Sequence, residues 1–267
     1  MPFFCQYAND NPFSPAAYRS MLRHYIASIP FFDLHFAFRK ANIDDFLKHG
    51  GKEAHLLRAY FIPELDFPLE SSDIEPEYRC DVVFAGHYED DGRAEALEAV
   101  YRAGYKLNLF GSGWEAALPR LSADSPLRTL YPIQPAVYQN YNQALCGAKV
   151  ALCFLSTLNQ DTYTTRSFQI PAMRVAMLSQ RTEDLSGLFV DGEEAAFFSD
   201  KAELLDKLRY LMEDSTARKR IAEGGYSRVY ADGHEVISRM RQWLETVQNY
   251  RERTTQVSPK NITQQND

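Results

Sequence analysis

Short apolar runs alternate with segments of helical periodicity through the central part of the chain. The apolar runs predict strands at residues 81–86, 106–111, 129–133, 149–155, 175–178 and 195–198. Apolar residues three and four positions apart predict helices at residues 93–103, 137–146 and 165–173, the last kept short or kinked by Pro171. Because strands and helices alternate, we expect an α/β fold with right-handed crossovers and a doubly wound parallel sheet.

The two ends of the chain show weaker patterns. Residues 15–29 have helical spacing, residues 33–38 and 54–62 predict strands, and Asn42 caps a short helix between them. Residues 201–213, 216–230 and 235–247 predict further helices, the second interrupted at Gly224 and Gly225. These patterns predict a partial N-terminal α/β domain at 1–70, a linker at 71–80, a Rossmann domain at 81–248 and a disordered polar tail at 249–267.

Composition indicates an ordinary globular protein of one large or two modest domains. The chain has 267 residues, of which 45% are hydrophobic and 24% charged, and a net charge of -7. That acidic balance disfavours nucleic acid as a partner. No apolar run is long enough for a transmembrane segment, and the N-terminus does not read as a signal peptide. Four scattered cysteines predict reduced thiols in a cytoplasmic protein, and the Asn261 sequon is a chance match.

Three loops follow predicted strands and should meet at one edge of the sheet. They are residues 86–93, 111–114 and 156–167. In open α/β sheets ligands bind outside the carboxyl ends of the strands. The sequence therefore predicts one cleft formed by these loops.

The first loop, GHYEDDGR, has two open interpretations. Gly86 allows close backbone approach, so Gly86 and Arg93 can hold a diphosphate. Alternatively the loop is a solvated acidic turn in which Arg93 pairs with Glu89 or Asp90. His87 directly follows the strand and is the candidate catalytic base, although a loop histidine is more often simply solvated.

The second loop, FGSGW, does not make a dinucleotide site. The Rossmann fingerprint needs G-x-x-G after the first glycine, and here Trp114 and Glu115 follow. The glycines then form a tight turn. No histidine and cysteine cluster has metal-ligand spacing, so we expect no metal, and no G-x-S-x-G is present.

The third loop carries the strongest chemical signal. The segment TYTTRSFQ places hydroxyls at Thr165 and Ser167, a guanidinium at Arg166 and an amide at Gln169 around a predicted helix start. Free helix amides and an arginine favour a phosphate, and Gln169 can reach a ribose hydroxyl. The alternative is N-capping by a threonine, with Arg166 in a surface ion pair.

The order of these motifs resembles the C-terminal half of GT-B glycosyltransferases. The resemblance rests on DVVFAG, DGR, LFGSGW, TTRSFQIPA, GEEAAFFSDKAELLDKLRYLMED, ARKRIAEGGYSRV and GH, within residues 81–245. The pattern is most similar to the CgeB-type (spore-maturation-like, group 1) branch. This resemblance implies glycosyl transfer, of the hexosyltransferase type, from a nucleotide-sugar donor to an unknown acceptor such as a polysaccharide, glycan or spore or cell-surface component.

The resemblance also implies roles for individual residues. Arg166 would bind the donor diphosphate, with Thr165 and Ser167 beside it, and Gly86 and Arg93 would face the phosphates. Gln169 would hold the ribose where the family usually has a Glu. The loop from Tyr131 to Ile133 would lie against the base. The leaving group would be stabilised without a metal.

Three departures from the family pattern leave a second reading open. Gln169 replaces an acid, Met173-Arg174 replaces Cys-Gly, and only about 75 residues precede the linker. These features are compatible with a catalytically silent nucleotide-sugar-binding or scaffold protein derived from a glycosyltransferase. A short N-terminal half would expose a sheet edge and favour homo- or hetero-oligomers that complete it. A phosphorylase or epimerase on the same scaffold is a third reading.

Overall fold

A computed structural model describes residues 2–14 and 19–256 of the chain. These residues divide into two compact units: residues up to 58 together with the last helix, and residues 59–235. The division lies earlier than the expected linker at 71–80. Residues 59–79 belong to the second unit because they bond to it, as in the hydrogen bond from Gln169 Nε2 to Asp66 Oδ1 (3.1 Å).

The larger unit is a parallel five-stranded sheet with the strand order β5-β4-β6-β7-β8. The strands are β4 (Cys80–Ala85), β5 (Leu107–Phe110), β6 (Ala148–Cys153), β7 (Ala176–Gln180) and β8 (Ala196–Phe198). Val82 is the register partner of both Leu107 and Val150, which places β4 between its neighbours. The predicted doubly wound α/β fold is confirmed for this unit.

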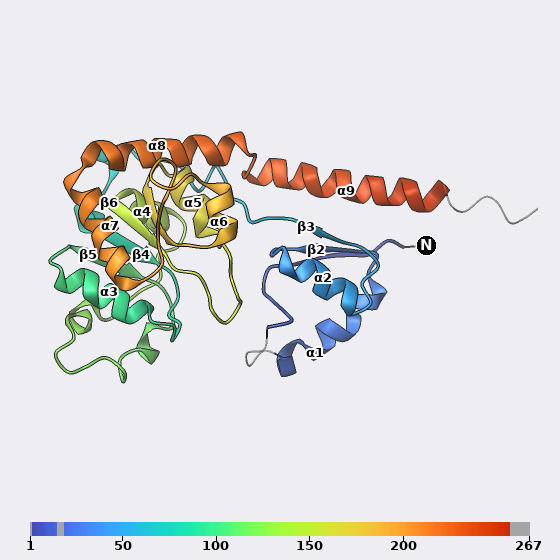
Figure 1. Ribbon diagram of the computed structural model, residues 1–267, viewed down its shortest axis with the longest axis horizontal. Helices are drawn as coiled ribbons and strands as arrows, with labels where there is room; N and C mark the ends of the chain where they lie inside the picture. The colour runs from blue at the N-terminus through green and yellow to red at the C-terminus, as the bar shows by residue number, and fades with distance from the viewer. Residues whose placement is uncertain (1, 15–18, 257–267) are drawn as a thin grey trace, which may run out of the picture. The chain divides into compact units, whose positions relative to one another are not determined.

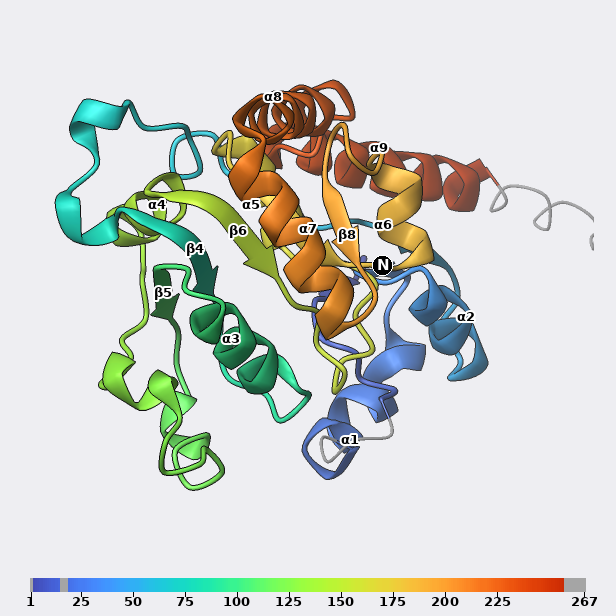
Figure 2. The same ribbon diagram turned by 60° about the vertical axis from the view of Figure 1, so that its left-hand side comes forward.

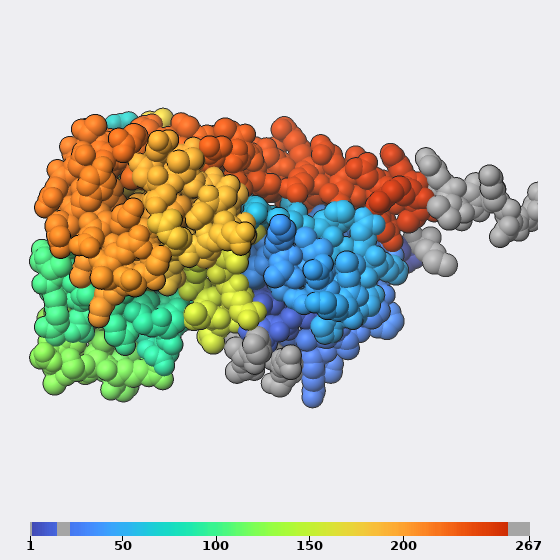
Figure 3. All heavy atoms as spheres, in the orientation of Figure 1, coloured from blue at the N-terminus to red at the C-terminus, as the bar shows by residue number. Residues whose placement is uncertain are grey.

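Helices cover both faces of this sheet. They are α3 (Arg93–Arg102), α4 (Gln139–Cys146), α5 (Arg166–Ala172), α6 (Glu183–Leu188), α7 (Lys201–Glu213) and α8 (Ser215–Ala231). Figure 2 shows α3 and α7 lying side by side over one face, with α4 and α5 on the other. In Figure 3, α7 and α8 (orange) form much of the surface of this unit on the side shown. The strands read as near-continuous apolar runs because both of their faces are buried.

The smaller unit is a parallel three-stranded sheet with the order β1-β2-β3. Its elements are β1 (Cys5–Ala8), α1 (Arg19–Ser28), β2 (Leu34–Ala37), α2 (Ala41–Lys48), β3 (Ala54–Leu56) and α9 (Val236–Gln256). Within this unit α1 and α2 lie on one side of the sheet and α9 on the other (Figure 1). The expected partial N-terminal α/β domain is therefore present as a short parallel sheet.

Two expectations about the C-terminal region need correction. Residues 249–256 are helical, because Trp243, Val247 and Tyr250 continue the apolar stripe of α9 along the sheet of the smaller unit. The rest of the expected tail, 257–267, lies outside the described residues, as does the Asn261 sequon. The predicted helix at 15–29 is observed from Arg19, because residues 15–18 also lie outside the described residues.

The predicted strand at residues 129–133 is absent. A 3-10 helix spans Pro126–Leu130, and the Tyr131–Pro132 peptide bond is cis. Pro132 lacks the backbone N–H that a strand at this position would need. This segment instead connects β5 to α4 as an irregular loop.

Helix α8 continues through Gly224 and Gly225 without the expected interruption. Both glycines lie against the backbone of Glu193 and Glu194. A side chain at Gly225 would come within 2.5 Å of the Glu194 carbonyl oxygen, and one at Gly224 would overlap that of Glu193. The glycines are thus required by close packing of α8 against this loop.

We expect Gly224→Ala to destabilise the protein by about 2 kcal/mol, although alanine is normally favoured over glycine inside a helix by about 1 kcal/mol. The matched control is Gly187→Ala in α6, where an added Cβ meets nothing within 4 Å. That variant should be neutral or stabilising. Thermal unfolding of both variants tests the packing argument, and equal stability of the two would contradict it.

Candidate functional site

The three predicted loops converge at the carboxyl end of β4, β5 and β6, as expected. Gly86 N donates to the Phe110 carbonyl (2.9 Å), and Tyr88 N donates to the Ser112 carbonyl (3.0 Å). The Ser156 hydroxyl donates to Glu89 Oε2 over 2.9 Å, which joins the first loop to the third. The loops therefore form one connected surface.

Gly86 and Gly111 allow the first two loops to approach each other and Arg166. The Trp114 indole donates to the Gly86 carbonyl (3.0 Å), and a Cβ at Gly111 would overlap that same carbonyl group. A Cβ at Gly86 would lie 3.2 Å from the Arg166 guanidinium carbon. The backbone of Gly86 thus forms a close wall beside the Arg166 side chain.

Arg166 presents an unpaired guanidinium at this surface. Its Nη2 donates weakly to the Phe154 carbonyl (3.4 Å), and its guanidinium carbon lies 5.7 Å from the centre of the Phe84 ring. Its Nε is buried without a hydrogen-bond partner, and no carboxylate of residues 2–14 and 19–256 lies within 4.0 Å of it. This leaves a half-buried positive charge able to receive an anion.

Arg93 does not reach this surface, which corrects the expectation that it faces a phosphate. It is 1% exposed. Its guanidinium forms an ion pair with Asp91 at 2.5 Å, donates to the His87 carbonyl at 2.7 Å and lies 3.5 Å from Glu89. Of the alternative partners Glu89 and Asp90, the structure shows the pair with Glu89, whereas Asp90 pairs with Arg120, and Asp91 is the closer partner of Arg93.

His87 is exposed, and its imidazole is held by a buried carboxylate. Its Nε2 lies 2.7 Å from Oε1 of Glu89, which is 6% exposed. Burial alone would raise the pKa of Glu89, but the His87 hydrogen bond, the Arg93 charge and the Ser156 hydroxyl outweigh it, so this pKa is lowered. Glu89 therefore remains a carboxylate at neutral pH.

The start of α5 offers fewer groups than the sequence indicated. The helix has only seven residues, and Ser167 is fully buried, with its hydroxyl accepting from Thr164 N (3.1 Å). The Thr165 carbonyl accepts from the amides of Phe168 and Gln169. Thr165, Arg166 and Gln169 are half-buried, so these three predicted residues can still meet a ligand.

Gln169 lies in a hydrogen-bonded chain with two residues that the sequence did not indicate. The Tyr141 hydroxyl donates to Gln169 Oε1 (3.2 Å), and Gln169 Nε2 donates to Asp66 Oδ1 (3.1 Å). Burial raises the pKa of Asp66, an effect that hydrogen bonds from the Ile62 amide and Gln169 partly oppose. Burial likewise raises the pKa of Tyr141, against the charge of Arg166.

The segment from Tyr131 to Ile133 presents little side-chain chemistry to a ligand. The Tyr131 hydroxyl donates to the Trp114 carbonyl (2.7 Å), and Ile133 is buried in the core. The next residue takes part through its backbone, since the Gln134 carbonyl accepts from Gly111 N (3.1 Å). Only the backbone of this loop could lie against a base.

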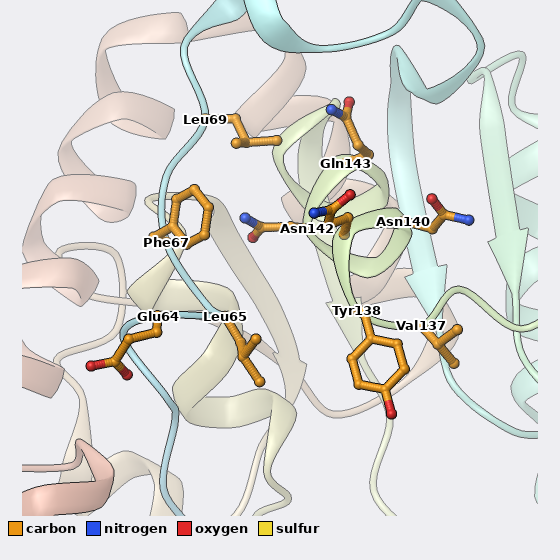
Figure 4. Close-up of a pocket in the computed structure, with 10 residues that line it drawn as sticks. Glu64, Leu65, Phe67, Leu69, Val137, Tyr138, Asn140, Asn142 and Gln143 are labelled. Atoms are coloured by element: carbon orange, nitrogen blue, oxygen red, sulfur yellow. The ribbon is translucent and has the colours of Figure 1, made fainter.

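A cavity of about 660 Å³ opens between residues 64–69 and the beginning of α4. Figure 4 shows Phe67 and Asn142 facing each other across it, with Leu65, Val137 and Tyr138 at one end. Asn142 is 3% exposed, and its Oδ1 has no hydrogen-bond partner among the described residues. Residues on both sides of Asp66 and of Tyr141 in sequence line this cavity, whereas Asp66, Tyr141 and Gln169 are not among its lining residues.

Tyr138 adopts a backbone conformation that non-glycine residues rarely take. Its φ and ψ are 52° and -122°, and its side chain is 78% exposed. Such strain costs about 1–3 kcal/mol and is found mainly where function requires it. This feature could not be predicted from the sequence, because a residue that precedes a helix is usually in an extended conformation.

A family model for glycosyl transferase-like proteins matches residues 93–245. The chain belongs to this family. The match begins at α3 and extends into α9, so it includes the third loop, α5 and Gln169. No curated protein matches the chain.

Solved structures with low sequence identity share the fold. HepE from Anabaena, in complex with UDP and glucose, has a TM-score of 0.72 at 14% identity over 91% of this chain and 71% of its own. Sucrose-phosphate synthase from Thermosynechococcus elongatus has a TM-score of 0.68 and 13% sequence identity, and the match covers 94% of this chain and 68% of that protein. The C-terminal domain of LpcC from Francisella tularensis has a TM-score of 0.52 and 16% sequence identity, and the match covers 66% of this chain and 99% of that domain. The fold is therefore that of GT-B glycosyltransferases.

The described residues contain no grouping of three or more His, Cys, Asp or Glu side chains that could hold a metal ion. All four cysteines are free. None of the described helices combines the length and apolar character needed to cross a membrane.

Proposed function

We propose that this protein transfers a sugar from a nucleotide-sugar donor to an acceptor, with the donor diphosphate bound by Arg166. The observation that carries this proposal is the half-buried guanidinium without a carboxylate partner, bordered by the Gly86 backbone. A planar fork of donors can hold two phosphate oxygens at once. Gly86 matters here because any side chain would crowd that fork.

The chemistry of the surface changes in the order of the parts of a nucleotide. Arg166 supplies a positive charge, Gln169 lies one helical turn further on with Asp66 and Tyr141, and the residues that flank Asp66 and Tyr141 in sequence line a cavity of apolar and amide groups. This order suits a diphosphate, a ribose and a planar base. In the cavity, Asn142 Oδ1 can accept a hydrogen bond from a base. The UDP complexes of HepE support this choice of ligand class by similarity.

Transfer requires that negative charge on the departing diphosphate be stabilised. Arg166 supplies that stabilisation in this proposal, with His87 as the candidate acid or base next to Gly86, and no metal ion takes part. The neutral amide of Gln169 replaces an acid at the ribose position. Oδ1 of Asp66 lies 3.1 Å from the Nε2 atom of that amide. A carboxylate is thus present beside the ribose position, and this supports an active enzyme over a silent one.

The remaining parts of the proposal concern the partners. In this proposal the larger unit binds the donor and the smaller unit lies on the acceptor side. The order of the sequence motifs supports a CgeB-type role, in the cytoplasm, on a polysaccharide, glycan or cell-surface component. Where the structure describes it, the smaller unit has three strands. A homo- or hetero-oligomer could supply further strands to it.

Donor binding predicts thermal stabilisation. At UDP-glucose a hundredfold above its dissociation constant, the unfolding free energy of the larger unit should rise by about 2.7 kcal/mol, which corresponds to about 5–10 °C in Tm. Release of free glucose or UDP over time separates turnover from binding alone. No shift with UDP-glucose, GDP-glucose or ADP-glucose would contradict the proposal.

A further inference from the structure

Glu89 is buried between the first and third loops, and both of its oxygens have partners. Oε1 faces His87 Nε2 at 2.7 Å, and Oε2 accepts from the Ser156 hydroxyl at 2.9 Å. Arg93 Nη2 lies 3.5 Å from Oε2. Because Ser156 and Arg93 belong to different elements, the carboxylate cannot turn away from the imidazole without breaking a second contact.

This contact determines the protonation pattern of the His87 ring. An ionised carboxylate can only accept hydrogen bonds, so Nε2 must carry the hydrogen that it shares with Glu89. The lowered pKa of Glu89 keeps that carboxylate ionised at neutral pH. Nδ1 is therefore the nitrogen that gains or loses a proton, and the side chain that carries it is 54% exposed.

The charged groups around His87 come from three elements. Gly86, the residue before it, lies against the Arg166 guanidinium of α5. Arg93 of α3 donates to the His87 carbonyl and is neutralised by Asp91 at 2.5 Å. On the outer side of the loop, Asp90 forms an ion pair with Arg120. Among these groups Arg166 is the cation without a carboxylate partner in the described residues, and the Gly86 backbone that lies against it belongs to the loop that carries His87.

We propose that Glu89 is a positioning residue that holds His87 with Nδ1 outward, so that the protonated ring donates a second hydrogen bond to the diphosphate bound by Arg166. This inference rests on the proposed function and adds a dependence on pH. Protonation places a donor and a positive charge at Nδ1, whereas the neutral ring offers a lone pair to an anion. Donor affinity must therefore be higher when the ring is protonated than when it is neutral.

UDP-glucose is the suitable probe, measured by calorimetric titration at about pH 8.5 and about pH 5.5, on either side of the usual histidine range. Its diphosphate is esterified at both ends and lacks the terminal group whose second proton titrates near pH 6. One charge-assisted hydrogen bond predicts about a tenfold gain in affinity at the lower pH.

Three variants separate positioning from a structural role. His87→Gln should bind UDP-glucose with the same affinity at both pH values. Glu89→Gln should reduce the gain to about twofold, because the ring is no longer held with Nδ1 outward. Ser156→Ala removes the other bond to Glu89 without a change of charge and leaves His87 and Arg93 beside the carboxylate, so it should keep both the affinity and the gain.

The outcomes distinguish this inference from the proposed function. Wild-type binding that is equal at both pH values overturns the inference alone. A full gain in His87→Gln or in a folded Glu89→Gln protein overturns it as well. If Glu89→Gln does not fold, His87→Gln still decides. Absence of UDP-glucose binding at either pH overturns both the inference and the proposed function.

Discussion

Replacement of Arg166 by alanine is expected to weaken UDP binding about a hundredfold. Two charge-assisted hydrogen bonds to a diphosphate contribute together about 3 kcal/mol, and each 1.4 kcal/mol is a factor of ten in affinity. The fold should be retained, because within residues 2–14 and 19–256 the Arg166 side chain makes a single weak hydrogen bond, at 3.4 Å to the Phe154 carbonyl. Calorimetric titration with UDP measures the loss.

Two further variants make this result specific. Arg166→Lys keeps the charge without the planar fork and should lose about tenfold. Arg181→Ala removes an arginine of the same unit that is already paired with Asp191 at 2.7 Å, and it should bind UDP like the wild type. A loss of less than threefold in Arg166→Ala, or an equal loss in Arg181→Ala, would place the diphosphate elsewhere.

Gly111→Ala should destabilise the protein by about 3 kcal/mol and abolish UDP binding at the concentrations that saturate the wild type. Gly111 has a φ of 149°, and a side chain there would overlap the Gly86 carbonyl. That carbonyl group also accepts the Trp114 indole hydrogen, so the whole contact between the first two loops must shift. Because Gly86 borders Arg166, the phosphate site shifts with it.

The control for this variant is Gly104→Ala. Gly104 has a φ of 89°, but an added Cβ there meets nothing within 4 Å. It should cost only the backbone strain of a left-handed alanine, about 1 kcal/mol, and leave UDP binding intact. Thermal unfolding and UDP titration of both variants measure the difference. If Gly104→Ala and Gly111→Ala behave alike, the close approach of the two loops is not what the site depends on.

The central sheet could be predicted from sequence because its strands are buried on both faces. Runs such as DVVFAG and KVALCFL are apolar throughout, and each is followed by a loop with clear turn residues. Strand β1 was not predicted, since Cys5–Ala8 is short and only its last residue is buried. The two glycines in α8 were misread because their reason lies in the backbone of residues 193–194, which no local pattern reveals.

The candidate site was predicted only where local signals were sufficient. Arg166 and Gly86 could be recognised from their positions after strands. Asp66 and Tyr141 could not, because they reach Gln169 across 103 and 28 positions of sequence. Arg93 and Ser167 looked equally available in sequence, yet the fold buries both. Whether an arginine binds a ligand or an internal carboxylate depends on burial, which here separates Arg166 from Arg93.

The most direct test of the account is an experimental structure of this protein bound to UDP-glucose. We expect a diphosphate oxygen within hydrogen-bond distance of the Arg166 guanidinium, with the ribose beside Gln169 and the base in the cavity lined by Phe67 and Asn142. A diphosphate bound away from Arg166, with that guanidinium still contacting only the Phe154 carbonyl, would contradict it.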